Sequence, residues 1–307
     1  MRYTANVYAV DDVSFRLNGE ETLGLVGESG CGKSTLGRTI MRIYDPTEGE
    51  IRFHGENIAG LKSSKLKNFR RNVQMVFQDP YSSLNPRMTI ASILDQPLRI
   101  HQRGGSARER LKFIEGLLDR VGLGRWALNR YPHEFSGGQR QRIAIARALT
   151  LHPKLVIADE AVSALDVSVQ SQILNLLKDL QKEFGMAYLF IAHDLAVVRH
   201  MAERVAVMYL GKIVEMGDRD ELFRAPKHPY TQALMAAIPV PGVKRDGKRV
   251  LLKGDVPSPV NPPSGCHFHP RCPFAVERCN KEVPVLRNIG TADKPYDVAC
   301  HLVEEKL

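Results

Sequence analysis

Apolar and polar residues along the chain predict strands that alternate with helices. Val13, Phe15 and Leu17 alternate with polar residues, which predicts a half-buried strand. Buried strands are expected at five short apolar runs: residues 22–26, 73–77, 155–158, 186–191 and 204–209. Residues 34–43 and 169–184 have the spacing of helices. This alternation indicates an α/β fold with a mostly parallel sheet, covered on both faces.

The pattern also predicts how the chain is divided. Residues 79–147 are mostly helical in pattern but are interrupted by glycine and proline. After residue 238 the chain becomes rich in Pro, Gly and Cys, with little periodicity. We therefore expect a main domain at 1–238, with a helical subdomain at about 79–147. A proline-rich linker and a small Cys-rich module are expected at 239–307.

Charge and hydropathy limit the possible surroundings. The 43 Lys and Arg outnumber the 34 Asp and Glu, for a net charge of +9. That excess is compatible with nucleic acid or an anionic membrane surface, but no block of like charges occurs, so we expect no nucleic-acid partner. There is no bilayer-length apolar run and no signal-peptide pattern at the start. We expect a cytosolic chain that reaches a membrane only through a partner.

A glycine-rich loop follows the predicted strand at 22–26 and opens a helix. It consists of Gly27, Glu28, Ser29, Gly30, Cys31, Gly32, Lys33, Ser34 and Thr35. Glycines allow the backbone N–H groups to turn around phosphates, and the helix N-terminus favours the same anion. Lys33 can reach the outer phosphates, and the Ser34 hydroxyl suits Mg²⁺.

A second element ends in two carboxylates. Residues 155–158 are apolar and lead to Asp159 and Glu160. Asp159 can hold Mg²⁺, usually through water, and Glu160 can orient or deprotonate an attacking water. With the glycine-rich loop, this element predicts a P-loop nucleoside triphosphatase.

A third motif lies at the start of a predicted helix. Ser136 is suited to be the N-cap, and Gly137 and Gly138 expose backbone N–H groups before Gln139. These residues can form a second anion site, although an ordinary capped amphipathic helix accounts for them equally well.

The order of the motifs resembles the ATPase cassette of ABC transporters. Residues 136–139 match the signature of that family, with Phe135 where leucine is commoner. Gln78 matches the glutamine of the Q-loop, Asp166 the D-loop and His193 the switch histidine. The resemblance implies that ATP is bound by residues 27–35, Gln78, residues 136–139, Asp166 and His193.

Further roles follow from the same resemblance. It implies that Lys33, Gln78, Glu160 and His193 are catalytic, and that Mg²⁺ is held by Ser34, Gln78 and Asp159. Two cassettes would close head to tail, so that the signature of one meets the γ-phosphate held by the other. The expected partners are a related ATPase in a heterodimer (a homodimer is the alternative), two transmembrane permease subunits and, indirectly, a substrate-binding protein. The expected location is peripheral, on the cytoplasmic side of the inner membrane.

Two later segments favour one branch of the family. Residues 226–235 and 257–266 resemble the ATPases of oligopeptide and dipeptide permeases. We expect peptide cargo, with nickel or another small cargo as the alternative. A non-transport ABC ATPase acting on nucleic acid or ribosomes and a P-loop kinase are the competing hypotheses.

Four cysteines crowd the C-terminal module: Cys266, Cys272, Cys279 and Cys300. Four thiolates can hold Zn²⁺ or an iron–sulfur cluster. Closely spaced zinc-type pairs are absent, so the spacing favours a cluster, and the resembled group is similar in carrying a [4Fe-4S] cluster there. Zn²⁺ and no metal remain the alternatives.

Two departures from the family pattern stand out. Ala161 follows Glu160 where the family usually has proline, which could loosen the turn after the carboxylate. The aromatic residue that stacks on adenine is not evident, and Tyr3 and Tyr8 are the candidates.

Overall fold

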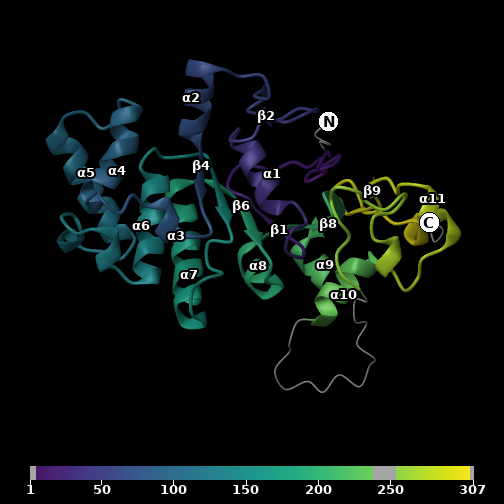
Figure 1. Ribbon diagram of the computed structural model, residues 1–307. Helices are drawn as coiled ribbons and strands as arrows, with labels where there is room; N and C mark the ends of the chain where they lie inside the picture. The colour runs from purple at the N-terminus through teal and green to yellow at the C-terminus, as the bar shows by residue number, and fades with distance from the viewer. Residues whose placement is uncertain (1–4, 238–253, 305–307) are drawn as a thin grey trace. The chain divides into compact units, whose positions relative to one another are not determined.

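The computed structural model describes residues 5–237 and 254–304, and the chain divides into two compact units. The first unit contains Met1–Arg16, Thr22–Leu36 and Ala192–Leu307, and the second contains Leu17–Glu21 and Gly37–Ile191. Both units contain strands and helices (Figure 1). The expected α/β class is confirmed.

In the first unit the strand order is β1-β7-β8-β10-β9. The strands are β1 (Thr22–Val26), β7 (Arg204–Tyr209), β8 (Lys212–Asp218), β10 (Asp297–Val298) and β9 (Arg287–Asn288). β1 pairs with β7 in parallel, whereas β7, β8, β10 and β9 pair antiparallel. All five residues of β1 are buried, as its apolar run predicts. A fully buried strand of this kind gives the following loop a fixed starting point.

The helices of this unit are α8 (Leu195–Met201), α9 (Arg219–Arg224), α10 (Pro229–Ala237), α11 (Glu277–Lys281), α12 (His301–Glu304) and the 3₁₀ turn η3 (His269–Arg271), together with the start of α1 (Lys33–Ile40). α8 packs against β1 at Gly24, where an added Cβ would lie 2.3 Å from the Val198 side chain. The absence of a side chain at Gly24 therefore permits this close helix–strand contact.

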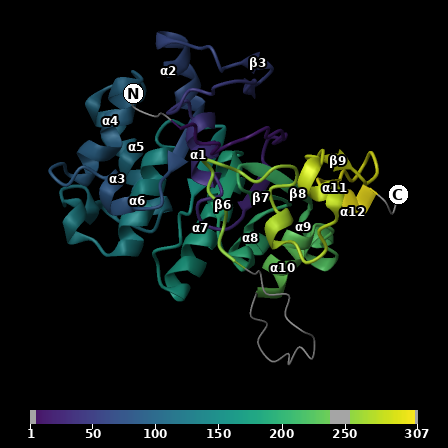
Figure 2. The ribbon, with the colours of Figure 1, turned by 45° about the vertical axis from the view of Figure 1, so that its right-hand side comes forward.

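The C-terminal module, which we define as the described residues 254–304, packs beside β8 (Figures 1 and 2). Its attachment includes a buried carboxylate, since Glu215 on β8 is fully buried and accepts a hydrogen bond from the Tyr296 hydroxyl at 2.6 Å. The backbone N–H groups of Lys227 and His228 donate to the same carboxylate at 2.6 and 3.0 Å. Glu215 thus joins β8, the approach to α10 and the C-terminal module.

The second unit contains the parallel strands β4 (Val73–Val76), β5 (Leu155–Asp159) and β6 (Ala187–Ala192), in the order β4-β5-β6. A short hairpin, β2 (Arg52–Phe53) and β3 (Glu56–Asn57), stands apart from these strands. The helices are α2 (Ser63–Asn72), α3 (Pro80–Ser83), α4 (Ile90–Ile100), α5 (Ala107–Arg120), α6 (Gly137–Leu149) and α7 (Val167–Phe184), with 3₁₀ turns at Arg125–Ala127 and Pro132–Glu134. α4 and α5 lie side by side, and α6 packs against both α4 and α7 (Figure 1).

Most predicted elements are confirmed. The five buried runs correspond to β1, β4, β5, β6 and β7, and the two helical patterns to α1 and α7. The strand predicted at Val13–Leu17 is wrong: side-chain exposure alternates there, but these residues form no strand. The division between residues 238 and 239, and most of the predicted linker, lie outside the described residues.

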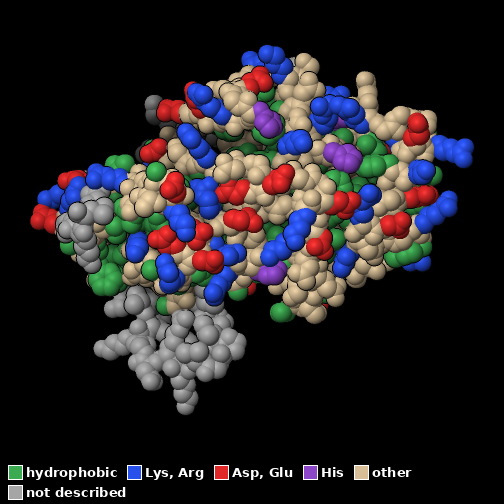
Figure 3. Space-filling view, turned by 180° about the vertical axis from the view of Figure 1, so that it is seen from behind, with side chains coloured by type: hydrophobic (Ala, Val, Ile, Leu, Met, Phe, Trp, Pro, Cys, Tyr) green, Lys and Arg blue, Asp and Glu red, His purple; other side chains and the backbone are tan. Residues whose placement is uncertain are grey.

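One face of the molecule has mixed charge. On the face shown in Figure 3, Lys and Arg side chains are interspersed with Asp and Glu. Within the part of the chain that the structure describes, no helix is long and apolar enough to cross a membrane.

Candidate functional site

The phosphate loop of the first unit is shaped by close backbone approaches. It begins at Gly27, directly after β1, where an added Cβ would lie 2.1 Å from the Met208 carbonyl oxygen. At Gly32, where φ is 105°, a Cβ would lie 1.9 Å from the Ala9 carbonyl oxygen. Both distances are too short for any side chain, so the path of this loop requires glycine at these two positions.

Lys33 is the first residue of α1 and is buried, with 4% of its surface exposed. Its ammonium group donates to the carbonyl oxygens of Gly27 and Glu28 at 2.8 and 2.9 Å. Ser34 and Thr35 follow in the first helical turn and are half-buried. The loop therefore holds a cation at the positive end of a helix, an arrangement that suits phosphate.

Cys31 lies inside the loop and is buried. Burial raises the pKa of its thiol, although the nearby Lys33 ammonium acts in the opposite direction. Burial therefore favours the protonated thiol of Cys31 at neutral pH.

The second unit brings Gln78 and Glu160 together, although they are 82 positions apart in sequence. The Gln78 side-chain amide, after β4, donates to the Glu160 carboxylate at 2.9 Å. Asp159 ends β5 and is buried, and Glu160 follows it in a left-handed backbone conformation with φ of 48°. A left-handed glutamate is uncommon, and such conformations concentrate at functional sites.

The serine–glycine motif caps α6. The Ser136 hydroxyl accepts a hydrogen bond from the Gln139 N–H, and the Gln139 side chain accepts one from the Ser136 N–H. Ser136 and Gly137 are exposed, whereas Gly138 faces α7, where a Cβ would lie 2.5 Å from the Val169 side chain. This helix tip is therefore firmly folded, and its first residues are open to solvent.

The remaining predicted site residues lie at helix starts. Asp166 occupies the N-cap position of α7, and both it and the adjacent Val167 are exposed. His193 belongs to the first unit and is exposed just before α8, whose N-cap is Asp194. The structure thus places the predicted residues in two groups: the phosphate loop and His193 in the first unit, and Gln78, Asp159, Glu160, Asp166 and the signature residues in the second.

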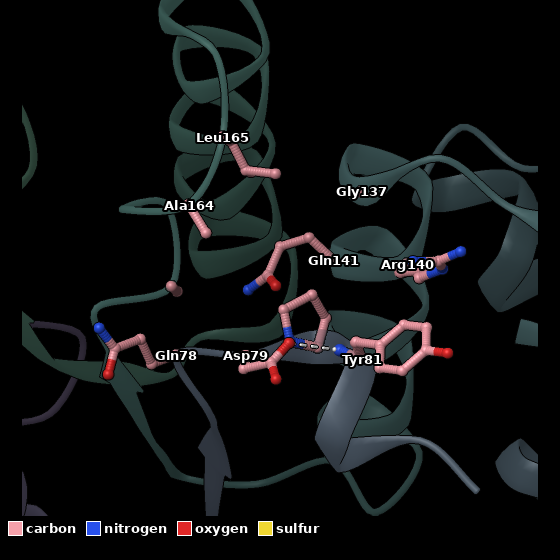
Figure 4. A pocket seen from close by; sticks show the side chains of 10 residues that line it. Gln78, Asp79, Tyr81, Gly137, Arg140, Gln141, Ala164 and Leu165 are labelled. Atoms are coloured by element: carbon pink, nitrogen blue, oxygen red, sulfur yellow. Dashed lines mark hydrogen bonds between the residues drawn. The ribbon is translucent and has the colours of Figure 1, made fainter. Parts of the chain in front are cut away.

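A pocket of about 130 Å³ lies within the second unit (Figure 4). Its lining includes Gln78 and Tyr81 from the segment after β4, Gly137 and Gln141 from α6, and Ala161. The guanidinium of Arg140, also in the lining, lies 4.9 Å from the centre of the Tyr81 ring. The pocket therefore lies between the segment that contains Gln78 and the start of α6.

Sequence reasoning missed two residues that contact the phosphate loop. The Arg271 guanidinium binds both carboxylate oxygens of Glu28, at 2.6 and 3.0 Å. The Tyr230 hydroxyl accepts a hydrogen bond from the Glu28 backbone N–H at 2.9 Å. Residues 28 and 271 are 243 positions apart, and an arginine in an irregular segment carries no local signal for such a pair.

The iron–sulfur cluster predicted at the four C-terminal cysteines is wrong, and so is its zinc alternative. Across residues 5–237 and 254–304 the structure forms no group of three or more His, Cys, Asp or Glu side chains that could hold a metal ion. Burial raises the pKa of Cys266 to about 11 and raises those of Cys272 and Cys300 as well.

The adenine contact stays a prediction. Tyr3 lies outside the described residues, and Tyr8 is 46% exposed.

Ala161 is buried beneath the turn after Glu160, and the Ser163 hydroxyl and backbone N–H donate to the Glu160 carbonyl at 3.0 and 3.1 Å. This turn is therefore closed by hydrogen bonds without proline.

Comparison with known sequences identifies the family. Residues 10–163 match the family described as ABC transporter, and residues 214–279 match the oligopeptide/dipeptide transporter C-terminal region. The chain is 56% identical to the oligopeptide transport ATP-binding protein AppF of Bacillus subtilis over 98% of this chain and 91% of that protein. It is 54% identical to the oligopeptide transport ATP-binding protein OppF of Haemophilus influenzae, covering 95% and 88% of the two chains.

Solved structures agree with the sequences. The chain is similar to the dimeric post-hydrolysis structure of the ATP-binding cassette MJ0796 bound to ADP and Pi, with a TM-score of 0.64 and 32% identity over 71% of this chain and 94% of that chain. It is also similar to cbiO1 from Clostridium perfringens, part of the transporter complex cbiONQ, with a TM-score of 0.63 and 29% identity over 71% and 84% of the two chains. The chain therefore belongs to the ABC transporter family, as one of its ATP-binding cassette subunits.

Proposed function

We propose that this chain hydrolyses ATP to energise the import of oligopeptides or dipeptides. The observation that carries the hydrolytic part is the contact between Gln78 and the Glu160 carboxylate at the end of β5. The peptide cargo is supported by the match of residues 214–279 to the oligopeptide/dipeptide transporter C-terminal region and by the names of the relatives. Cargo does not follow from the cassette itself, because other subunits of such a transporter contact it.

The phosphate loop would bind the triphosphate. Its backbone N–H groups and the N-terminus of α1 supply donors, and Lys33 supplies the positive charge. The Lys33 ammonium already bonds to two loop carbonyl oxygens, so its position is set before phosphate arrives. A preplaced charge needs little reorganisation during the reaction.

Glu160 would act on the attacking water, and Gln78 would orient Glu160. The amide of Gln78 donates to one oxygen of the Glu160 carboxylate, and a carboxylate held in this way can accept a proton from water. The Ser34 hydroxyl and the Asp159 carboxylate are hard oxygen donors that suit Mg²⁺, which would neutralise charge on the phosphates. His193 would steady the terminal phosphate.

The exposed tip formed by Ser136 and Gly137 would complete the site of another cassette. It is a capped helix N-terminus open to solvent, and Asp166 at the start of α7 is exposed as well. Donors on both sides of the γ-phosphate stabilise its charge better than donors on one side. Dimeric structures of a similar cassette, MJ0796, support this pairing.

The proposed assembly contains this chain, a related ATPase and two permease subunits, with a substrate-binding protein delivering the peptide. A heterodimer of ATPases is favoured, and a homodimer is the alternative. The chain would sit peripherally on the cytoplasmic side of the inner membrane, where closing and reopening of the cassettes would reorient the permease.

Uptake by the reconstituted transporter tests this function. Proteoliposomes with the complete complex should accumulate labelled di- and oligopeptides when ATP is present on the cassette side, and peptide should raise the rate of phosphate release. Uptake of nickel without uptake of peptide would reject the peptide cargo. Transfer of phosphate to an acceptor in place of water, or binding of this chain to DNA or ribosomes with no permease, would reject transport.

A further inference from the structure

Glu28 of the phosphate loop binds Arg271 of the C-terminal module. The two Arg271 nitrogens bind separate carboxylate oxygens, which fixes the plane of the carboxylate as well as its position. The Arg271 side chain is 6% exposed and that of Glu28 is 27% exposed. This pair is therefore largely shielded from water, unlike the surface pairs of the same module.

Three separate groups of Glu28 are engaged at once. Its carboxylate binds Arg271, its backbone N–H donates to the Tyr230 hydroxyl at 2.9 Å, and its carbonyl oxygen accepts from the Lys33 ammonium at 2.9 Å. A path of direct hydrogen bonds thus leads from Arg271 through a single loop residue to Lys33. Displacement of Glu28 would move an acceptor of the phosphate-binding ammonium.

Packed aromatic rings lie beside Arg271. Arg271 ends the turn η3, close to the fully buried Phe268. The Phe268 ring packs against the rings of Tyr209 and Tyr230, with centroids 5.2 and 5.3 Å apart. The Arg271 guanidinium lies 5.8 Å from the centre of the Tyr209 ring. The guanidinium thus lies beside packed aromatic rings and is directed at Glu28 of the phosphate loop.

The charges make the pair relevant to nucleotide binding. Glu28 places a carboxylate in a loop that would receive a polyanion, and an unpaired carboxylate there would repel phosphate. Arg271 neutralises this carboxylate, and its hydrogen bonds to Glu28 raise its own pKa, so it stays charged. The module therefore supplies both a fixed position and a compensating charge.

We propose that Arg271 is a positioning residue for ATP hydrolysis: through Glu28, the C-terminal module sets the conformation of the phosphate loop and the place of the Lys33 ammonium. This inference rests on the proposed ATPase function. It gives the C-terminal module, which lies outside the residues that match the ABC transporter family, an indirect part in nucleotide binding, through Glu28.

Steady-state ATP hydrolysis by the assembled transporter tests the proposal, with Arg271→Met, Arg271→Lys, Glu28→Gln and the double variant Glu28→Gln/Arg271→Met. Arg271→Met leaves the Glu28 carboxylate unpaired, and we expect KM for ATP to rise about tenfold with a smaller change in kcat. Arg271→Lys keeps the charge but loses the paired contact, so its KM should be intermediate. The double variant removes both charges, and its KM should return most of the way to that of the wild type.

Arg278→Ala is the matched control, because Arg278 is a more exposed arginine of the same module that pairs with Glu282. Its KM should equal that of the wild type. Thermal unfolding shows whether each variant is folded. If Arg271→Met does not fold, Glu28→Gln and Arg271→Lys test the proposal in its place. A KM for ATP that is unchanged in both of these variants overturns the proposal. An unchanged KM in folded Arg271→Met, or a double variant whose effects simply add, overturns it too. A wild-type transporter that does not hydrolyse ATP contradicts the proposed function instead.

Discussion

At the scale of single residues, the backbone of Glu160 is unusual. Glu160 has a left-handed backbone with φ of 48°, and its N–H donates to the Ile191 carbonyl oxygen at 2.9 Å. That conformation costs on the order of 1–3 kcal/mol for a residue with a side chain. It turns the carboxylate away from the line of β5 and toward Gln78. Local strain at Glu160 thus accompanies a contact that a regular turn would not make.

Replacing Glu160 tests its role directly. Glu160→Gln keeps an oxygen that can accept from Gln78 but removes the base, so we expect ATP turnover to fall by about 10²-fold or more while ATP binding persists. Phosphate release and binding of a fluorescent ATP analogue measure the two effects. Glu183→Gln, at an exposed ion pair with Arg120, is the control and should leave turnover unchanged. Unchanged turnover in Glu160→Gln would remove Glu160 from the mechanism.

Gly32 gives a second prediction at this scale. Gly32→Ala places a Cβ 1.9 Å from the Ala9 carbonyl oxygen at a φ of 105°, so the loop must shift. We expect ATP affinity to fall tenfold or more, which corresponds to about 1.4 kcal/mol or more. Gly60→Ala is the matched control, since a Cβ there meets nothing within 4 Å. Equal ATP affinity in the two variants would show that the close approach does not shape the loop.

At the scale of elements, a buried histidine directly precedes α10. His228 is 1% exposed, and its Nδ1 accepts a hydrogen bond from the Tyr230 N–H at 3.0 Å. Burial lowers the pKa of His228 to about 3, so the folded chain keeps this imidazole neutral. The neutral ring is part of the packing that holds Tyr230, and through Tyr230 the backbone of Glu28.

This histidine predicts loss of stability in acid. Below pH about 6.5 the unfolded chain binds a proton that folded His228 does not, so the free energy of unfolding falls by up to about 1.4 kcal/mol per pH unit, until the pH reaches about 3. His228→Asn keeps an acceptor for the Tyr230 N–H but cannot titrate. Urea unfolding at pH 7 and pH 5 should show a smaller loss in the variant than in the wild type, by roughly 2 kcal/mol. Equal losses would contradict the burial of a neutral ring.

The elements also show what sequence patterns can predict. The five buried strands were identifiable because a short, unbroken run of apolar residues is typical of a strand buried in the core. β8 was missed, because its fully buried Glu215 interrupts the apolar pattern and looks like a solvent-exposed position. Residues 13–17 have an alternating pattern without forming a strand, because periodicity reports exposure and not pairing.

The candidate site was predictable where local motifs are distinctive. The phosphate loop and the carboxylates after β5 can each be read from neighbouring residues, and family resemblance added Gln78. The contact of Arg271 with Glu28 could not be predicted, because it depends on how the C-terminal module packs beside β8. The spacing of the four C-terminal cysteines led to the wrong prediction of a metal cluster, because cysteines that are near in sequence need not form a metal site.

At the scale of the whole molecule, the proposed function implies that one chain contributes to the binding of two different nucleotides. The phosphate loop is a cradle with its cation in place, and the tip formed by Ser136 and Gly137 is capped, rigid and exposed. If this tip contacts the nucleotide of a partner cassette, it does not contact the nucleotide bound by the phosphate loop of its own chain. The central claim is therefore that ATP is enclosed only when two cassettes close on each other.

A structure of the assembled transporter carrying Glu160→Gln, determined with Mg-ATP, tests this claim most directly. We predict that the Ser136 hydroxyl and the N–H groups at the start of α6 contact the γ-phosphate of an ATP bound by the phosphate loop of the opposing cassette. If the tip faces open solvent while ATP is bound, with no second cassette within reach of the γ-phosphate, the account is contradicted.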